Sequence, residues 1–384
     1  MPGIRRGQST LNRPQFTDDS NQTTSDQTIR QEAGISAQTV QFTPGGSIPE
    51  TAFTRDVLAA AERCVGDPAQ MIHALQTTPG APLLPGRGET AALWELLASV
   101  AAVDLTAART LEPHLDAAAI LDQAGLGWEP GSAWGVFAAE GPGLRLEATP
   151  GHDDGTWLLS GDKPWCSLAG SLDAAVITAT VPDGRRAFAL DLRQTGVVPV
   201  AGTWASHGLA QVPSGPVRLD GALAHPVGAT GWYLQRDGFA WGSLAVASCW
   251  FGGAVGLFRT LHASAGRREP DQLALAWLGE ADRWLASGAS LLAQAGASVD
   301  TGTVGWRQAH RVRGQIALLC ERLLALCGQA LGPGPLAFDA EHARRVSDLQ
   351  VYIRQHHAAR DDAALGRLLL EDQEPEASHG TCPW

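Results

Sequence analysis

The chain has 384 residues, enough for two or three domains with a substantial core. Hydrophobic residues make up 44% of it and charged residues 18%, which is typical of globular domains. The formal net charge is −12 and the arginines are scattered, which argues against nucleic acid or an anionic membrane as a partner, because phosphate binding needs a concentrated basic face.

The first part of the chain divides into a polar arm and a helical domain. Residues 1–50 are rich in Gln, Thr, Ser and Asp, and cannot bury enough apolar surface to offset the entropy of ordering them. We therefore expect a disordered arm, and no signal peptide is visible before residue 50. The pattern then becomes helical, with a break at residues 79–88 and a second helical run over residues 91–123. Residues 51–133 are predicted to form an N-terminal helical domain.

The periodicity changes at residue 134. Short apolar runs at residues 134–139, 157–160, 174–181 and 186–192 alternate with turns rich in Gly and Pro. The sequence Pro-Asp-Gly at residues 182–184 indicates a hairpin between the last two runs. We predict that residues 134–232 form a middle antiparallel β domain.

Helical periodicity returns after residue 232 and predicts helices over residues 236–264, 271–297, 305–331 and 339–371. Four long amphipathic helices in succession indicate a C-terminal four-helix bundle over residues 233–371, followed by a loose tail at 372–384. Residues 238–258 carry no charge and are long enough to span a bilayer, but their many small residues suit a closely packed central helix. We therefore expect an α+β fold with no membrane segment.

The six cysteines include no CxxC pair and no zinc-like pattern. We interpret them as free thiols in a reducing cytosol, so the expected location is cytoplasmic and no metal site is expected. GxGxxG after a strand, the P-loop, GxSxG and HExxH are also absent. Their absence argues against Rossmann dehydrogenases, P-loop NTPases and α/β hydrolases.

Four local patterns occur in a common order. Residues 157–167 (WLLSGDKPWCS) resemble the W-x-L-x-G-x-K-x-W-I-T strand pair of acyl-CoA dehydrogenases. Residues 136–143 (VFAAEGPG) resemble a degraded form of that family's T-E-P-x-A-G-S-D flavin loop, with Arg145 where the family's serine meets the pyrophosphate. Residues 253–257 (GAVGL) are similar to the start of its helical bundle, and residues 329–332 (QALG) to its Q-x-x-G-G turn. The resemblance covers about residues 50–370 and agrees in domain order.

The resemblance implies FAD, held between the β domain and the bundle. Trp165 would stack on the isoalloxazine ring, and Ser167 would place its hydroxyl near N5 and O4. The backbone amides of Ala138 and Ala139 would meet the pyrimidine edge. The protein would position and tune the cofactor, which performs the redox step.

The family's Gln-Gly turn contacts the dinucleotide of a neighbouring subunit, so Gln329 and Gly332 imply a homodimer or homotetramer. Simpler interpretations stay open. Trp165 could be an ordinary core tryptophan, since the chain has 13 tryptophans, and Ser167 a surface strand residue. Gln329 could be a solvated residue at a helix end.

The resemblance also implies an FAD-dependent oxidoreductase that removes a proton from an acyl thioester or related small substrate and passes a hydride to flavin N5. The family's carboxylate base lies in a Y-E-G sequence eight residues after an R-D aspartate. In this chain the residue eight positions after Asp348 is His356, and Ser347 stands in place of the arginine. Some family members carry the glutamate on the first bundle helix instead, but residues 238–258 contain no carboxylate. The chain is thus a divergent member by this resemblance, lacking the usual catalytic glutamate.

Three functions remain open. His356 could act as the base, because imidazole titrates near neutral pH. The chain could instead be a flavin-dependent monooxygenase on the same fold using His356, or a non-catalytic member that binds a flavin or another ligand. The alternative for residues 352–362 is a solvated amphipathic helix in which His357 and Asp361 form an i,i+4 pair.

The expected partner is a small-molecule substrate such as an acyl-CoA, and the sequence does not name the electron acceptor. The middle domain and the first bundle helix should line the substrate cleft. Trp241, Trp250 and Phe251 would make this cleft narrow and aromatic.

Overall fold

The computed structural model describes residues 39–46, 48–127, 130–267 and 269–371. Four helices open it: α2 (Ala52–Cys64), α3 (Pro68–Thr77), α4 (Thr90–Val103) and α5 (Leu105–Gln123). The helical run predicted over residues 91–123 is wrong at one point, because it breaks at Asp104. The extended backbone of Asp104 lets its side chain accept the Ala107 N–H and cap α5, a role that competes with a continuous helix.

The arm expected over residues 1–50 is shorter than predicted, because Val40 and Phe42 are buried. The Val40 N–H donates to Ser99 Oγ (2.8 Å) and the Phe42 N–H to Glu95 Oε1 (2.7 Å), both on α4. The composition argument averaged over fifty residues and missed two apolar side chains with partners on a distant helix. The rest of the expected arm, residues 1–38, lies outside the described residues, as does the tail at 372–384.

Seven strands follow: β1 (Trp134–Phe137), β2 (Leu146–Pro150), β3 (Trp157–Lys163), β4 (Ala174–Val181), β5 (Gly184–Asp191), β6 (Val197–Pro199) and β7 (Val217–Val227). Strands β4, β2, β3, β7 and β5 close into a five-stranded ring, with β1 beside β4 and β6 beside β7. The predicted hairpin is confirmed, since β4 and β5 pair antiparallel around residues 181–184.

The antiparallel prediction is wrong for two pairings, because β4 runs parallel to both β1 and β2. A hairpin signal concerns only strands that are neighbours in the sequence. The loop over residues 164–173 connects β3 to β4 and allows β4 to lie between β1 and β2. Hairpin patterns do not predict the direction of pairing between such non-consecutive strands.

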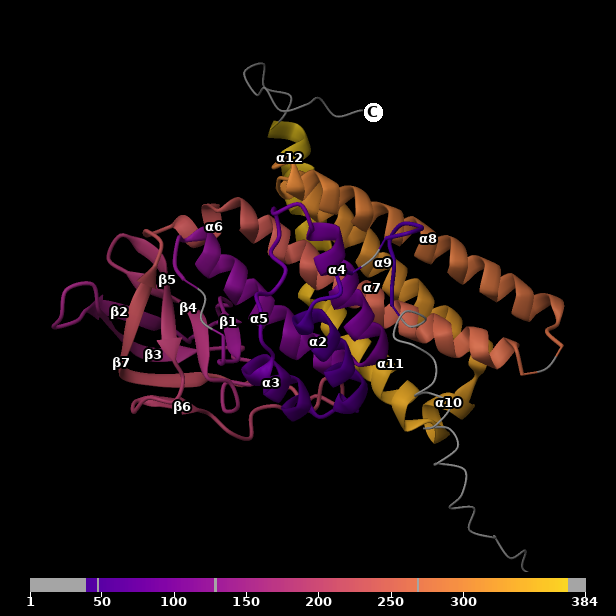
Figure 1. Cartoon of the computed structure of the whole chain (residues 1–384), viewed down its shortest axis with the longest axis horizontal. Helices are drawn as coiled ribbons and strands as arrows, with labels where there is room; N and C mark the ends of the chain where they lie inside the picture. Colours follow the sequence, from indigo (N-terminus) through magenta and orange to yellow (C-terminus); the bar gives the residue numbers. More distant parts are fainter. Residues whose placement is uncertain (1–38, 47, 128–129, 268, 372–384) are drawn as a thin grey trace, which may run out of the picture. The chain divides into compact units, whose positions relative to one another are not determined.

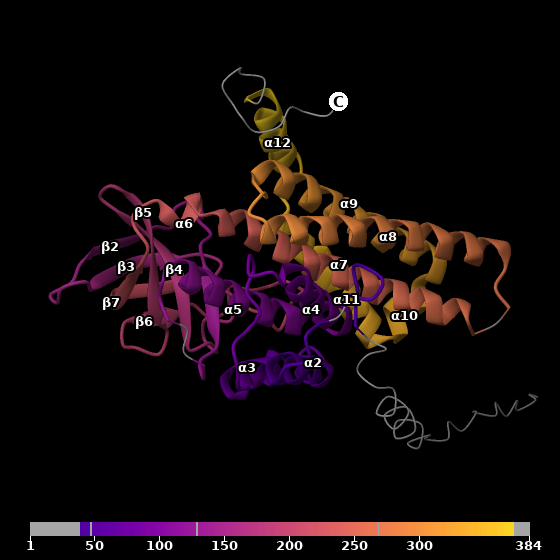
Figure 2. The same ribbon diagram turned by 45° about the horizontal axis from the view of Figure 1, so that its top comes forward.

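The C-terminal part comprises α6 (Trp232–Gln235), α7 (Asp237–Ala265), α8 (Gln272–Asp300), α9 (Trp306–Leu331), α10 (Pro333–Phe338), α11 (Ala340–Tyr352), the 3₁₀ turn η2 (Ile353–Gln355) and α12 (Ala359–Glu371). The first three predicted long helices are confirmed. The fourth is wrong as a single helix, because it ends at η2 and restarts as α12. Figure 2 shows α12 standing away from the other helices, and its contacts are with α9.

Helix α7 lies at the centre of the helical part, in contact with α4, α5, α8, α9 and α11 (Figure 1). Its glycines allow α4 to come close: a Cβ added at Gly252 would lie 2.2 Å from the Ala98 carbonyl oxygen. By length and composition, both α7 and α9 could cross a membrane. However, 67% of the most apolar 18-residue stretch of α7 is buried inside the protein. The packing of its neighbours thus accounts for the apolar character of α7.

Candidate functional site

Trp165 lies in the loop after β3 and is 57% exposed, although it is a large aromatic residue. Its backbone is left-handed (φ +60°), as is that of Leu168 (φ +59°), a conformation that costs an L-residue roughly 1–2 kcal/mol. The Cys166 N–H donates to the Gly215 carbonyl (3.0 Å) and the Leu168 N–H to the Pro213 carbonyl (2.9 Å). The loop over residues 200–216 therefore holds the loop after β3 in a strained conformation that exposes the Trp165 indole to solvent.

A second tryptophan stands beside Trp165. Trp204, from the loop over residues 200–216, meets its ring edge-on, with centroids 6.5 Å apart and planes at 87°. The Trp204 indole N–H donates to the Leu209 carbonyl (3.1 Å), which fixes its orientation. No local pattern indicates that Trp204 packs against Trp165, because about forty residues separate them.

Ser167, two residues after Trp165, is buried, and its N–H donates to the Trp165 carbonyl (3.1 Å). Its hydroxyl pairs with Ser214 Oγ (2.7 Å) and accepts from Arg109 Nη2 (3.1 Å). Arg109 belongs to α5, and its guanidinium also lies 3.4 Å from Glu112 Oε2 and 5.8 Å from the centroid of the Tyr352 ring. Sequence reasoning missed Arg109, although a single arginine within the otherwise uncharged stretch of residues 105–111 (LTAARTL) is a recognisable signal.

Asp348 joins the loop over residues 200–216 to α11. Its buried carboxylate accepts the Leu209 N–H (2.6 Å), and a Cβ added at Gly208 would lie 2.0 Å from the Ser347 carbonyl oxygen. Burial raises the pKa of Asp348 to about 6, against the Leu209 hydrogen bond, which lowers it. Trp165, Ser167 and Trp204 therefore sit where the strand region meets α5 and α11. We call these three residues with Arg109 and Ser214 the tryptophan seam.

Ala138 and Ala139 follow β1. The Ala138 carbonyl accepts from Arg185 Nη2, and Ala139 lines a cavity of about 230 Å³ together with Arg145 and Lys163. Lys163 is buried and donates to the Thr178 carbonyl (2.7 Å), and burial lowers its pKa to about 8. These contacts involve the Ala138 carbonyl, so a role for the two amides stays a prediction.

Gln329 and Gly332 lie at the end of α9. Gln329 is exposed, and Gly332 caps the helix at φ +65°, a conformation that favours glycine. A Cβ added at Gly332 would meet nothing within 4 Å. The glycine is thus explained by the helix end, and a contact with a neighbouring subunit stays a prediction.

His356 lies in the turn between η2 and α12, so the alternative of one solvated helix over residues 352–362 is wrong. Ala358 at φ +48° breaks the helix, and Arg313 Nη2 donates to the Gln355 carbonyl (3.0 Å). The His357–Asp361 pair of that alternative is nevertheless present, at 3.4 Å. Burial lowers the pKa of His356, against the opposing effect of Asp361, so its imidazole is neutral near pH 7.

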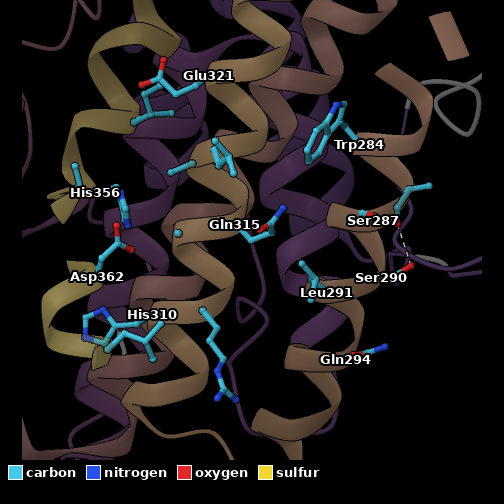
Figure 3. A pocket seen from close by; sticks show the side chains of 18 of the residues that line it. Trp284, Ser287, Ser290, Leu291, Gln294, His310, Gln315, Glu321, His356 and Asp362 are labelled. Carbon is cyan, nitrogen blue, oxygen red and sulfur yellow. Dashed lines mark hydrogen bonds between the residues drawn. The ribbon is translucent and has the colours of Figure 1, made fainter. Parts of the chain in front are cut away.

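His356 lines an open groove of about 1470 Å³ between α8, α9 and α12. Figure 3 shows His310, His356 and Asp362 on one wall and Trp284 and Leu291 on the other. Within the described ranges, no hydrogen bond or ion pair joins His356 to the tryptophan seam. Buried neighbours lie between the two regions: Tyr352 packs on Trp250 (6.4 Å), and Arg313 lies over the Trp250 ring (4.7 Å).

The expected aromatic cleft is wrong for Trp250 and Phe251, which are 0% and 2% exposed. Phe42 packs edge-on against Phe251 (5.7 Å), and Tyr352 covers Trp250. Trp241 is partly buried close to Gly86, where an added Cβ would lie 2.8 Å from its ring. No group of three or more His, Cys, Asp or Glu suited to a metal occurs among the residues that the structure describes.

No protein-family model and no curated protein matches the chain. Its structure is similar to KijD3 in complex with FMN and dTDP-3-amino-2,3,6-trideoxy-4-keto-3-methyl-D-glucose (TM-score 0.67, 18% identity, 86% of this chain and 96% of that one). It is also similar to glutaryl-CoA dehydrogenase from Mycobacterium smegmatis (0.68, 16%, 84% and 95%) and to dibenzothiophene monooxygenase TdsC from Paenibacillus sp. A11-2 (0.66, 19%, 86% and 100%).

These similarities define the fold class. The chain has the acyl-CoA dehydrogenase-like fold that its sequence motifs predicted. At identities below 20%, the likeness concerns the fold and leaves activity and ligand to the chain's own residues.

Proposed function

We propose that this chain is an FAD-dependent oxidoreductase that holds its flavin at the tryptophan seam. One observation carries the proposal: a strained loop, held by a second loop, keeps the Trp165 indole 57% exposed near the buried hydroxyl of Ser167. An isoalloxazine ring has a large apolar face and a polar edge. An exposed indole with a nearby hydroxyl offers a partner for each.

The residues present fit such a ring. The exposed Trp165 indole supplies a stacking face, and Trp204 packs edge-on against it. Arg109 and Ser214 hold the Ser167 hydroxyl in place. A bound flavin would supply hydride transfer and reaction with oxygen, for which the amino-acid side chains have no equivalent. The three similar proteins support the proposal, since one is solved with FMN and the other two are named as a dehydrogenase and a monooxygenase.

Flavin binding tests the proposal directly. The purified chain is titrated with FAD and with FMN, and the visible spectrum and the quenching of flavin fluorescence are followed. We expect FAD to bind, and Trp165→Leu to weaken binding about tenfold, because an aromatic pair contributes about 0.5–1.5 kcal/mol beyond its buried area. Leu273→Ala is the control, since Leu273 is 61% exposed near the start of α8, which packs mainly on α4, α7 and α9. A chain that binds neither flavin, or a Trp165→Leu variant with unchanged affinity, contradicts the proposal.

A second candidate function is a flavin-dependent monooxygenase on the same fold. The position of His356 argues against the first candidate, because this residue lines the groove beside α12, and among the described residues no hydrogen bond or ion pair joins it to the tryptophan seam, where a dehydrogenase would need its base. Dehydrogenation needs a base within about 3 Å of the substrate proton, whereas oxygen activation does not begin with that step. Anaerobic bleaching of the loaded flavin by acyl-CoA thioesters supports dehydrogenation. Oxygen consumption by the reduced protein without such bleaching supports the monooxygenase.

We also infer a homodimer or homotetramer. Gln329 is exposed at the end of α9, in the position that resembles the family's intersubunit turn. Light scattering after size exclusion measures the state of the chain. FAD that binds a strict monomer with full affinity counts against a role for Gln329 in cofactor binding.

A further inference from the structure

We propose that Glu112 and Arg109 form a positioning pair that orients the Ser167 hydroxyl and sets the charge beside the polar edge of the flavin. This inference rests on the proposed function. It assigns a role to two buried charged residues on α5 that neither the motifs nor the comparisons single out.

The geometry gives Arg109 two partners at once. Its Nη2 donates to Ser167 Oγ (3.1 Å), while Nη1 lies 3.4 Å from Glu112 Oε2, three residues further along α5. The two side chains are only 13% and 8% exposed. Burying a charged pair costs several kcal/mol in desolvation, so such a pair is weak evidence for stability and calls for another explanation.

The hydrogen bonds fix the direction of the Ser167 hydroxyl. A guanidinium only donates, so Ser167 Oγ accepts from Arg109. Ser214 Oγ donates to the Val212 carbonyl (3.0 Å), which uses its only proton, and Ser167 therefore donates to Ser214. The remaining lone pair of Ser167 is an acceptor. It matches the N–H that a flavin carries at N5 when reduced and does not match the bare N5 of the oxidised ring.

Glu112 controls the charge of this arrangement. Burial raises its pKa to about 7, and Asp116 adds to this effect, whereas Arg109 and Arg313 lower the pKa. Two further titratable groups face it, Cys249 on α7 and Tyr352 on α11, and burial holds both in their neutral form. Above pH 7 the pair is neutral overall, and below pH 7 it leaves the positive charge of Arg109 uncompensated beside Ser167. That charge favours a reduced, more negative flavin.

The position of the flavin reduction equilibrium tests this inference in the FAD-loaded protein. The ratio of reduced to oxidised flavin is measured against a reference dye between pH 6 and pH 8. Reduction of a flavin takes up a proton, so the ratio falls with pH in every variant. In Glu112→Gln we expect only this dependence to remain, without the additional fall that ionisation of Glu112 causes in the wild type, so that at pH 8 the ratio exceeds the wild-type ratio about tenfold. Arg109→Gln shifts the ratio toward oxidised flavin at every pH, and Arg109→Lys restores part of the charge effect. Glu341→Gln removes an Arg–Glu pair on α11 whose glutamate is half-exposed, and serves as the control.

A flavin-free measurement accompanies it. Infrared titration of the flavin-free chain should show a protonated carboxyl band lost near pH 7 in the wild type and in Glu341→Gln. In Glu112→Gln this band should be smaller and be lost at lower pH, since the carboxyl of Asp348, with a pKa of about 6, remains. Circular dichroism checks that each variant folds, and Glu112→Asp retains a titrating group if the glutamine variant does not fold. A chain that binds no flavin refutes the proposed function and this inference with it. Flavin that binds tightly while its reduction equilibrium is the same in wild type, Glu112→Gln and Arg109→Gln refutes this inference alone.

Discussion

Glu112 should make the stability of the folded chain depend on pH in a direction opposite to that of an ordinary carboxylate. Its pKa is about 7 in the folded protein, against an ordinary value of 4.5. Between these values the folded state holds a proton that the unfolded state has lost, so the free energy of unfolding falls as the pH rises. The folded and unfolded pKa values differ by about 2.5, and each pKa unit corresponds to about 1.4 kcal/mol. The free energy of unfolding therefore falls by on the order of 3 kcal/mol over this pH range.

Glu112→Gln removes this loss, because glutamine does not ionise. At pH 5 both proteins carry a neutral side chain beside Arg109, and we expect similar stabilities. At pH 8 the variant should be more stable than the wild type by on the order of 3 kcal/mol, measured by denaturant unfolding at both pH values. Glu341→Gln should follow the wild type. Parallel pH dependence in wild type and Glu112→Gln would show that Glu112 is not desolvated in solution, and the reasoning would then be refuted.

Two further predictions concern packing and the seam. Gly252→Ala should lower the free energy of unfolding by about 1–3 kcal/mol, because its Cβ would lie 2.2 Å from the Ala98 carbonyl oxygen. The control Gly279→Ala, at an exposed position of α8, should be neutral or stabilising by up to about 1 kcal/mol. Thermal unfolding compares the two variants, and equal midpoints would contradict the close approach of α4 and α7. Asp348→Ala should cost about 1–3 kcal/mol because it leaves the buried Leu209 N–H unpaired, and Asp348→Asn, which keeps an acceptor oxygen, should retain most of the stability in the same assay.

The periodicity of the sequence predicted most of the elements, because a helix or strand with one buried face repeats its apolar residues at a fixed interval. The helices from residues 237, 272 and 306 and the hairpin at 181–184 follow this rule. The three missed breaks, at residues 65–67, at Asp104 and after Gln355, depend on hydrogen bonds of particular side chains. Arg313 holds the Gln355 carbonyl from another helix, and no local pattern encodes that contact.

The site was predictable in part. Trp165 and Ser167 came from a motif that is continuous in the sequence, and the structure places both at the tryptophan seam. Trp204, Ser214 and Arg109 reach the same point from a later loop and an earlier helix. The order of residues along the chain carries little information about such contacts.

The expected cleft failed for a related reason. Trp250 lies on α7, which the sequence correctly showed to be apolar, but an apolar helix can face a cleft or a core equally well. Tyr352 and Arg313, from two other helices, fill the space on its side. An aromatic residue lines a cavity only where the neighbouring side chains leave the space beside it empty. The hydrophobicity of its own helix does not determine this.

The relation between the tryptophan seam and His356 bears on the choice between the two candidate functions. The contacts that lead from Ser167 toward His356 run through Arg109, Tyr352, Trp250 and Arg313. Two of these are arginines, which donate hydrogen bonds and do not accept them, and the other two are buried aromatic residues. A row of this kind does not relay a proton from the seam to a neutral imidazole. If His356 does serve as a base, its substrate must therefore reach it through the groove between α8, α9 and α12. In that case flavin bleaching and the loss of activity in a His356→Asn variant would report on different places in the molecule. If activity depends on Glu112 and not on His356, the proton chemistry belongs to the seam itself.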